Sequence, residues 1–182
     1  MKKVQRGPMR EMYKGHIFTI KQQDVVLPNG AKALFEYCER PSSVSVLAFN
    51  NKKELLMIKE WRLGYDKNVW FLPGGRIDHK NDTPKKAAQR ELREETGYRA
   101  NTMKLVHKKS PASTLHWDIY VYAAKDLEID PLPLDTGEII IPQFVSLKKA
   151  VQMALDGTIE NEFISYNIIR FDYMMRHGEF TW

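Results

Sequence analysis

The sequence predicts a mixed α/β protein, in which an α/β/α sandwich is built around one core. Short apolar or alternating segments, typical of strands, recur along the chain. Segments with helical periodicity are interspersed among them after residue 83. The length of 182 residues and the hydrophobic content of 43% suit one well-cored domain with a small appendage. Such a mixture is expected to place helices on a mixed central sheet.

The first 41 residues are expected to form a small antiparallel β-sheet. Apolar residues alternate in His16–Ile20 and again in Ala33–Tyr37, and a Leu-Pro-Asn-Gly turn at 27–30 lies between them. So small a sheet buries too little apolar surface to be stable alone, and should pack on the main domain or on a second subunit. We therefore divide the chain into a region 1–41, for dimerisation or substrate binding, and a main domain 42–182.

The main domain begins with two predicted strands joined by a tight turn. Val44–Phe49 is a compact apolar run, and Glu54–Lys59 returns as its partner. Further short strands are expected to complete the central sheet over Val69–Leu72, Met103–Lys108, Trp117–Ala123 and Gln143–Ser146.

Helices are predicted from cap residues and from periodicity. Thr83 is a suitable N-cap for a helix over 84–96, and Gly97 has the position at which a left-handed residue ends a helix. Amphipathic helices are also expected over Leu147–Leu155 and Glu162–Arg176. The apolar side of the last helix is expected to carry Phe163, Tyr166, Ile169 and Tyr173.

Composition narrows the class of protein. No apolar run approaches the roughly 18–20 residues that span a bilayer, and no hydrophobic segment follows the basic start, so neither a membrane anchor nor a secretory signal is expected. The single cysteine, Cys38, excludes an intrachain disulfide and a multi-cysteine zinc site, and favours a cytoplasmic setting. The net charge of +5 suits an anionic ligand, but no basic cluster with interleaved aromatics indicates nucleic-acid binding.

One predicted helix concentrates carboxylates. Glu91 and Glu95 lie one helical turn apart, and Glu94 lies beside both. Like charges at this spacing weaken a helix by roughly a few tenths of a kcal/mol, so they need compensation by Arg90 and Arg93 or by a bound cation. Carboxylates on a rigid helix are suitable ligands for Mg²⁺ or Mn²⁺ together with substrate phosphates. The alternative interpretation is an exposed helix stabilised by Arg–Glu pairs.

The same segment resembles the Nudix box, Gly-x5-Glu-x7-Arg-Glu-U-x-Glu-Glu-x-Gly-U, in which U is a bulky apolar residue. Residues 90–98, Arg-Glu-Leu-Arg-Glu-Glu-Thr-Gly-Tyr, match its second half, and the Leu-Pro-Gly-Gly lead-in at 72–75 also matches. One departure occurs: six residues rather than five separate Gly75 from the next acid, which is Asp82 instead of glutamate. We treat Asp82 as a hypothetical substitute for that glutamate.

The resemblance implies a hydrolase that uses Mg²⁺, with Mn²⁺ as the alternative ion. Glu91 and Glu95 would be the principal ligands, helped by Glu94 and by the carbonyl of Gly74. Arg90 would orient the glutamates through a salt bridge. A divalent ion neutralises a diphosphate and lowers the pKa of a bound water, which then needs a group to accept its proton.

Features outside the box resemble ADP-ribose pyrophosphatases and related nucleoside-diphosphate-sugar hydrolases. They are Tyr-Lys-Gly at 13–15, the turn at 27–30, the strand end Ile58–Arg62, which resembles Gln-Tyr-Arg, and Ser-Pro at 110–111. This branch implies hydrolysis of a nucleoside-diphosphate sugar, with ADP-ribose as the leading candidate, to AMP and ribose 5-phosphate. It also implies a homodimer, because its members swap the N-terminal sheet.

Candidate site residues outside the box belong to three segments. Arg62 is suited to bind a phosphate, since its guanidinium is planar and always charged. In this branch the general base often comes from an acidic loop after the box, where Glu138 and Asp135 are the candidates, and Glu94 in the box remains a third. The other candidate substrate contacts are Arg76 and Phe18, the latter by stacking on a purine.

Two rival functions remain open, and a third, RNA decapping, is consistent with the net charge of +5 but is not supported by any basic cluster. The box binds metal and diphosphate and does not recognise the base, so GDP-mannose or another nucleotide sugar is the nearest rival substrate. A rival of another class is a nucleotide-binding regulator that has kept the fold and lost turnover. Retention of Glu91, Glu94 and Glu95 argues against such a loss.

Overall fold

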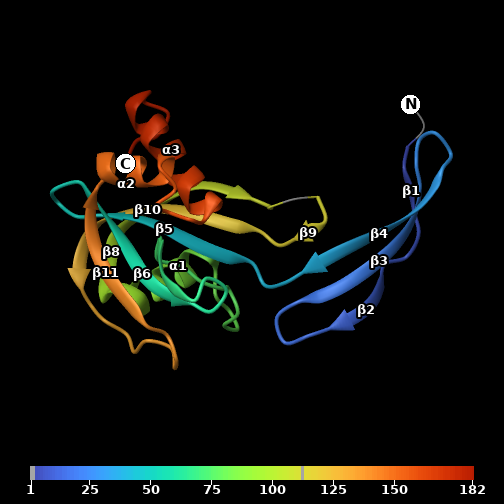
Figure 1. Cartoon of the computed structure of the whole chain (residues 1–182), viewed down its shortest axis with the longest axis horizontal. Helices are drawn as coiled ribbons and strands as arrows, with labels where there is room; N and C mark the ends of the chain where they lie inside the picture. Colours follow the sequence, from blue (N-terminus) through green and yellow to red (C-terminus); the bar gives the residue numbers. More distant parts are fainter. Residues whose placement is uncertain (1–2, 112) are drawn as a thin grey trace. The chain divides into compact units, whose positions relative to one another are not determined.

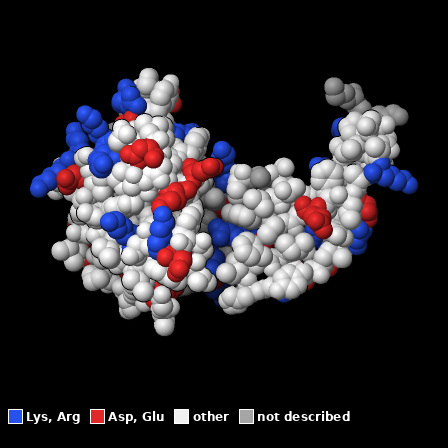
Figure 2. Space-filling view, viewed as in Figure 1, with Lys and Arg blue, Asp and Glu red and all other residues white. Residues whose placement is uncertain are grey.

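The computed structural model describes residues 3–111 and 113–182, which form two compact units. The first unit consists of the described residues up to Ser42 and of the segment Lys109–Ile119. The second consists of Ser43–Lys108 and Tyr120–Trp182. No helix within the described part of the chain is long and apolar enough to cross a membrane. On the face drawn in Figure 2, basic and acidic side chains are interspersed over the second unit.

The first unit is a small, mostly antiparallel sheet (Figure 1). Its strand order is β1-β3-β4-β9, and β2 also pairs with β3. The expected N-terminal sheet is present, but β9 comes from the later segment, which the sequence analysis placed in the main domain, and it pairs with β4 in parallel. The strands are β1 (Gln5–Arg6), β2 (Arg10–Lys14), β3 (Thr19–Val26), β4 (Lys32–Glu39) and β9 (Leu115–His116).

The second unit contains a larger sheet with the strand order β11-β6-β5-β10-β8, in which β7 also pairs with β6. Antiparallel pairs join β6 to β5, to β7 and to β11. Its strands are β5 (Ser43–Phe49), β6 (Glu54–Arg62), β7 (Lys67–Phe71), β8 (Tyr98–Lys109), β10 (Ile119–Ile129) and β11 (Ile140–Ser146).

Alternate residues of β5 face different helices, because successive side chains of a strand point to opposite faces. Leu47 and Phe49 belong to a core cluster with the helices α2 (Leu147–Leu155) and α3 (Glu162–Arg176). Val46 and Ala48 belong to a second cluster with α1 (Pro84–Thr96). Helices thus cover both faces of the sheet, and the predicted α/β/α sandwich is confirmed.

The helix ends agree with their predicted caps, but one predicted helix face was wrong. Thr83 accepts a hydrogen bond from the amide of Lys86, and Gly97 is left-handed with φ 76°. On α3, Tyr166 and Tyr173 are exposed. The buried side is displaced by one or two positions, so that the hydroxyl-bearing rings face water; it is formed by Ile164, Ile168, Phe171 and Met174.

Candidate active site

Helix α1 is docked on the sheet by small and apolar residues. Ala87, Ala88 and Leu92 are fully buried in the cluster with β5. This packing fixes the rotation of the helix, since residues three to five positions apart share its docked face. Glu91 and Glu95 are consequently directed towards the loop that follows β7, and Glu95 is itself buried.

The loop after β7 is held against the first residues of β5. The amides of Val46 and Val44 donate to the carbonyls of Pro73 and Gly75 over 2.8 and 2.9 Å. A Cβ on Gly74 would lie 2.2 Å from the Val44 carbonyl oxygen, and one on Gly75 would lie 2.5 Å from the Glu91 carboxyl group. Side chains at these two positions would displace the strand or the glutamate, which is the physical reason for two glycines.

Two glutamates of α1 lie at this loop in environments that favour their protonated forms. Glu95 Oε2 accepts a hydrogen bond of 2.7 Å from the amide of Gly74. Burial raises the pKa of Glu95 well above its ordinary value, although the Gly74 amide acts in the opposite direction. Burial also raises the pKa of Glu91 to about 7, with Glu94 contributing and Arg90 opposing the rise. The fold thus buries both carboxyl groups in surroundings that disfavour their charged forms.

Arg90 is the centre of an ionic network on the exposed side of this cluster. Its Nη1 atom lies 2.7 Å from Glu94 Oε2 and 3.0 Å from Glu91 Oε1. Its Nε atom lies 3.3 Å from Asp82 Oδ2, and its Nη2 atom donates to the carbonyl of Arg76 over 3.1 Å. The longer loop therefore brings Asp82 into the network of box residues. Arg90 has the geometry expected of a residue that orients the glutamates.

A buried acid that the sequence analysis did not single out lies on β6 beside this cluster. Glu60 is 4% exposed, and its Oε2 atom lies 2.6 Å from Nη2 of Arg62. The Arg62 guanidinium also lies over the Phe71 ring, 4.9 Å from its centroid. Burial raises the pKa of Glu60, and Glu138 contributes to the rise. The sequence did contain a signal for Glu60, because it is a charged residue that interrupts the apolar run of β6.

The register of β6 and β11 brings the acidic loop to the same place. Ile140 pairs with Glu60, and the amide of Trp61 donates to the carbonyl of Ile139, so Glu138 lies next to the end of β6. Burial raises the pKa of Glu138, with Asp135 and Glu94 contributing and with Arg62 and Arg76 opposing the rise. Glu138 is therefore near the carboxylates of α1, and Asp135 is near Glu138.

A divalent cation fits the chemistry of this donor set. Glu91 and Glu95 present carboxylate oxygens, the ligand type that Mg²⁺ prefers, and burial raises the pKa of each carboxyl group. Within residues 3–111 and 113–182 no group of three or more acidic, histidine or cysteine side chains is already arranged to hold a metal.

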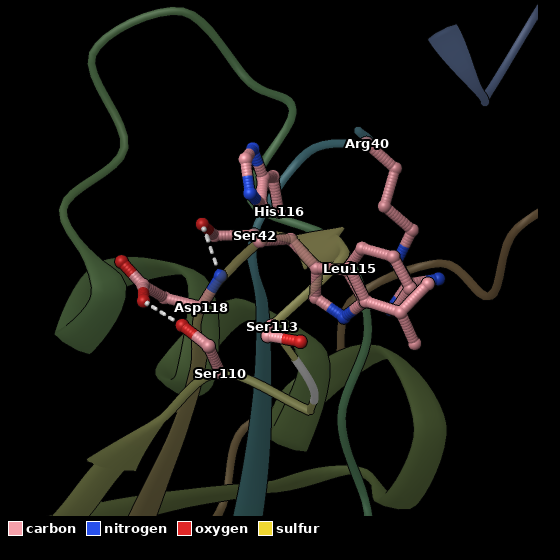
Figure 3. A pocket seen from close by; sticks show the side chains of 8 residues that line it. Arg40, Ser42, Ser110, Ser113, Leu115, His116 and Asp118 are labelled. Carbon is pink, nitrogen blue, oxygen red and sulfur yellow. Dashed lines mark hydrogen bonds between the residues drawn. The ribbon is translucent and has the colours of Figure 1, made fainter. Parts of the chain in front are cut away.

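Phe18 belongs to the first unit. Phe18 is 43% exposed, and its ring centroid lies 6.5 Å from that of Trp117. The Arg40 guanidinium lies over the Trp117 ring, 4.8 Å from its centroid. A cavity of about 530 Å³ adjoins Arg40 and Trp117 (Figure 3). In it the Ser110 hydroxyl donates to Asp118 over 3.0 Å. The remaining lining residues are Ser42, Ser113, Leu115 and His116.

The sequence pattern of the NUDIX domain matches residues 39–165, which is more than half of the chain. The chain belongs to the Nudix family. The Nudix hydrolase resembles an ADP-ribose pyrophosphatase of Bacillus subtilis (strain 168), with 26% identity over 161 residues that cover 87% of this chain and 86% of that protein. It also resembles a methanol dehydrogenase activator of Bacillus methanolicus, with 28% identity over 167 residues that cover 90% and 88%.

A solved structure shares the fold of this Nudix hydrolase. The crystal structure of an ADP compounds hydrolase superposes with a TM-score of 0.82 at 22% identity and covers 99% of this chain and 98% of the other. The resemblance to the Nudix family, and to proteins named ADP-ribose pyrophosphatase, is thus confirmed. The roles of the individual site residues stay predictions.

Proposed function

We propose that this Nudix hydrolase cuts the diphosphate linkage of nucleoside-diphosphate sugars with Mg²⁺, and that ADP-ribose is its leading substrate. The products would be AMP and ribose 5-phosphate. The observation that carries the proposal is the placement of Glu91 and Glu95 beside the loop at Gly74, with Glu138 brought to them from another element. Relatives named ADP-ribose pyrophosphatase support the substrate class.

The metal would be held by Glu91 and Glu95, with Glu94 and the Gly74 carbonyl as further ligands. A bound Mg²⁺ would neutralise the diphosphate and polarise its phosphorus–oxygen bonds. Arg90 keeps the glutamates oriented, because it contacts Glu94 and Glu91 at the same time. Mn²⁺ has the same preference for oxygen ligands and is the expected substitute.

Glu138 is our proposed general base. A base near neutral pH needs a raised pKa and an oxygen able to reach the attacking water, and burial raises the pKa of Glu138. Glu94 is less suited, because an ion pair of 2.7 Å with Arg90 occupies one of its oxygens. Asp135 is the remaining candidate, and the amide of Glu138 donates to its carbonyl over 3.2 Å.

Arg62 and Arg76 are our proposed phosphate contacts. Their positive charges lower the pKa of Glu138, so both guanidinium groups lie near the proposed base. Glu60 and Phe71 restrain Arg62, which lowers the entropy lost when it binds an anion. We also propose that Phe18 stacks on a purine base in a swapped dimer.

The region 1–41 is proposed to serve dimerisation as well as substrate binding. Large apolar side chains are exposed on its sheet, among them Tyr13 and Leu34. A second copy of the chain would cover them. A cytoplasmic setting is proposed from the single cysteine, Cys38.

The test is a phosphate-release screen with Mg²⁺ and with EDTA over ADP-ribose, GDP-mannose, UDP-glucose, NADH and diadenosine polyphosphates. We expect ADP-ribose to be cut fastest, and only with the metal. Glu138→Gln should lower kcat by about 10²- to 10⁴-fold and leave nucleotide binding unchanged. Glu95→Gln should weaken Mn²⁺ binding, measured by electron paramagnetic resonance.

Other outcomes of the screen would favour a rival function or contradict part of the proposal. Faster cutting of GDP-mannose would favour the rival substrate, and tight nucleotide binding without any turnover would favour the regulator. Hydrolysis that persists in EDTA would contradict the metal site. A normal rate in Glu138→Gln would exclude this residue as the base.

A further inference from the structure

The C-terminal end of α1 forms hydrogen bonds with the root of the loop that carries Glu138, which we define as residues 130–132. The amide of Asp130 donates to the carbonyl of Gly97 over 2.9 Å, and the amide of Leu132 donates to the carbonyl of Arg93 over 3.3 Å. The Arg93 side chain donates two further hydrogen bonds to Asp130. Its Nε atom donates to the Asp130 carbonyl and its Nη2 atom to Asp130 Oδ1, both over 3.0 Å.

Arg93 is well suited to this contact and is not required by the box itself. It occupies a position that the box leaves open to any residue, between Leu92 and Glu94. Its planar guanidinium binds a main-chain and a side-chain oxygen of the same residue, which fixes both position and orientation. Arg99 adds a second cation, with Nε 3.3 Å from Asp130 Oδ2.

The loop beyond this root is attached chiefly through its two ends. Its residues from 133 to 139 are exposed, so they bury little surface that could hold them in place. At the far end Ile140 pairs with Glu60 on β6, the strand that also bears Arg62. At the near end Asp130 is bound to α1, the helix that bears Glu91 and Glu95. Each end of the loop is thus attached to an element that carries site residues.

We propose that Arg93 is a positioning residue, which locks the root of the 130–139 loop to the C-terminal end of the carboxylate helix and thereby sets the place of Glu138. The part that concerns Glu138 rests on the proposed function, whereas the anchoring of the loop does not. A general base must lie within hydrogen-bond reach of its water, and a displacement of about 1 Å costs on the order of 10²-fold in rate. Arg93 itself touches no reacting atom.

The first measurement is hydrogen exchange of the loop amides by mass spectrometry in Arg93→Ala, Arg93→Lys and the wild type. Arg93→Ala should exchange faster between residues 131 and 139, and the lysine variant should restore part of the protection. Arg176→Ala is a matched control, because Arg176 forms an exposed ion pair of 2.5 Å with Asp172 on α3. This control should exchange as the wild type does over residues 131–139.

The second measurement is a double-mutant cycle on ADP-ribose hydrolysis. Arg93→Ala should lower kcat by about 10- to 100-fold with little change in KM. In the Glu138→Gln background the same substitution should lower kcat no further, because the residue through which it acts is already lost. An equal loss in both backgrounds would overturn the positioning role.

Two outcomes separate this proposal from the proposed function. If no variant, nor the wild type, hydrolyses a nucleotide sugar, the proposed function fails, while hydrogen exchange still tests the anchor. Unchanged exchange in Arg93→Ala would overturn the anchor even in an active enzyme. Should Arg93→Ala not fold, Asp130→Asn removes the ionic part and keeps the main-chain bonds, and it must then show the same two effects.

Discussion

The two sheets of this protein differ in how much of their apolar surface the chain itself covers. Every residue of β5 in the second unit is buried, whereas every residue of β2 in the first unit is exposed. Helices cover both faces of the larger sheet, but the first unit contains none among its described residues. The second unit therefore carries its own core, and the first leaves large apolar side chains exposed.

The largest expected effect is on the core of the second unit. Phe171 is 1% exposed and its ring stacks on that of Phe49 with centroids 5.4 Å apart. Phe171→Ala should lower the free energy of unfolding by about 3–5 kcal/mol, through lost burial and the cavity left behind. Chemical denaturation measures this loss. Phe35→Ala, on the first sheet, should cost below about 1 kcal/mol, and equal losses would refute the contrast.

The buried carboxylates of the second unit predict an unusual dependence of stability on pH. Because the pKa of Glu91 rises from 4.5 to about 7, the folded chain binds more protons than the unfolded chain between these values. The free energy of unfolding should therefore fall as pH rises through this window, by on the order of 3 kcal/mol for this group. Denaturation at pH 4 to 8 in EDTA measures the slope.

Substitution of Glu91 and binding of Mg²⁺ should both reduce the dependence of the unfolding free energy on pH. Glu91→Gln removes the titrating group, and Mg²⁺ compensates its charge, so each should make stability at pH 8 approach that at pH 5. Glu36→Gln, on an exposed strand of the first unit, is the control and should leave the slope as it is. A slope that persists in Glu91→Gln would show that Glu91 is not its source.

The smallest effect on stability is expected on the first sheet, where the oligomeric state should respond instead. The registers of β2, β3 and β4 place Tyr13 and Leu34 on one face, and they are 64% and 52% exposed. Leu34→Asp should convert a dimer into a monomer in size-exclusion chromatography. The unfolding free energy should change by less than about 0.5 kcal/mol.

A matched substitution in the second unit tests whether this response is specific. Leu155 is 66% exposed at the end of α2, and Leu155→Asp should leave the dimer intact. A wild-type chain that elutes as a monomer at micromolar concentration would contradict the homodimer itself.

Local signals made the ends of α1 predictable. Its N-cap at Thr83 and its left-handed Gly97 depend on residues next to each other in the chain, so the sequence alone was sufficient. The buried face of α3 was predicted wrongly. Tyr166 and Tyr173 were counted among its apolar residues, but their hydroxyl groups favour contact with water, and both residues are exposed. The pairing of β9 with β4 joins residues far apart in the sequence, and no local pattern encodes it.

In the candidate site, too, residues close together in the sequence were predictable, and contacts between residues far apart were not. The glutamates of α1 and the glycines at 74–75 are close in sequence, and their pattern alone indicated that they act together. Glu60 could not be assigned in this way, because its place beside Glu138 depends on the register of β6 and β11. The bond between Arg93 and Asp130 spans 37 positions and is likewise a product of folding.

The parallel pair of β9 and β4 makes the first unit discontinuous in sequence. A fragment that ends at Ser42 would lack β9, and a chain trimmed to begin at Ser43 would leave Leu115 without its β4 neighbour Cys38. The first unit therefore cannot be exchanged between proteins by joining two chains at one point. A working chimera must transfer residues 109–119 together with the N-terminal segment.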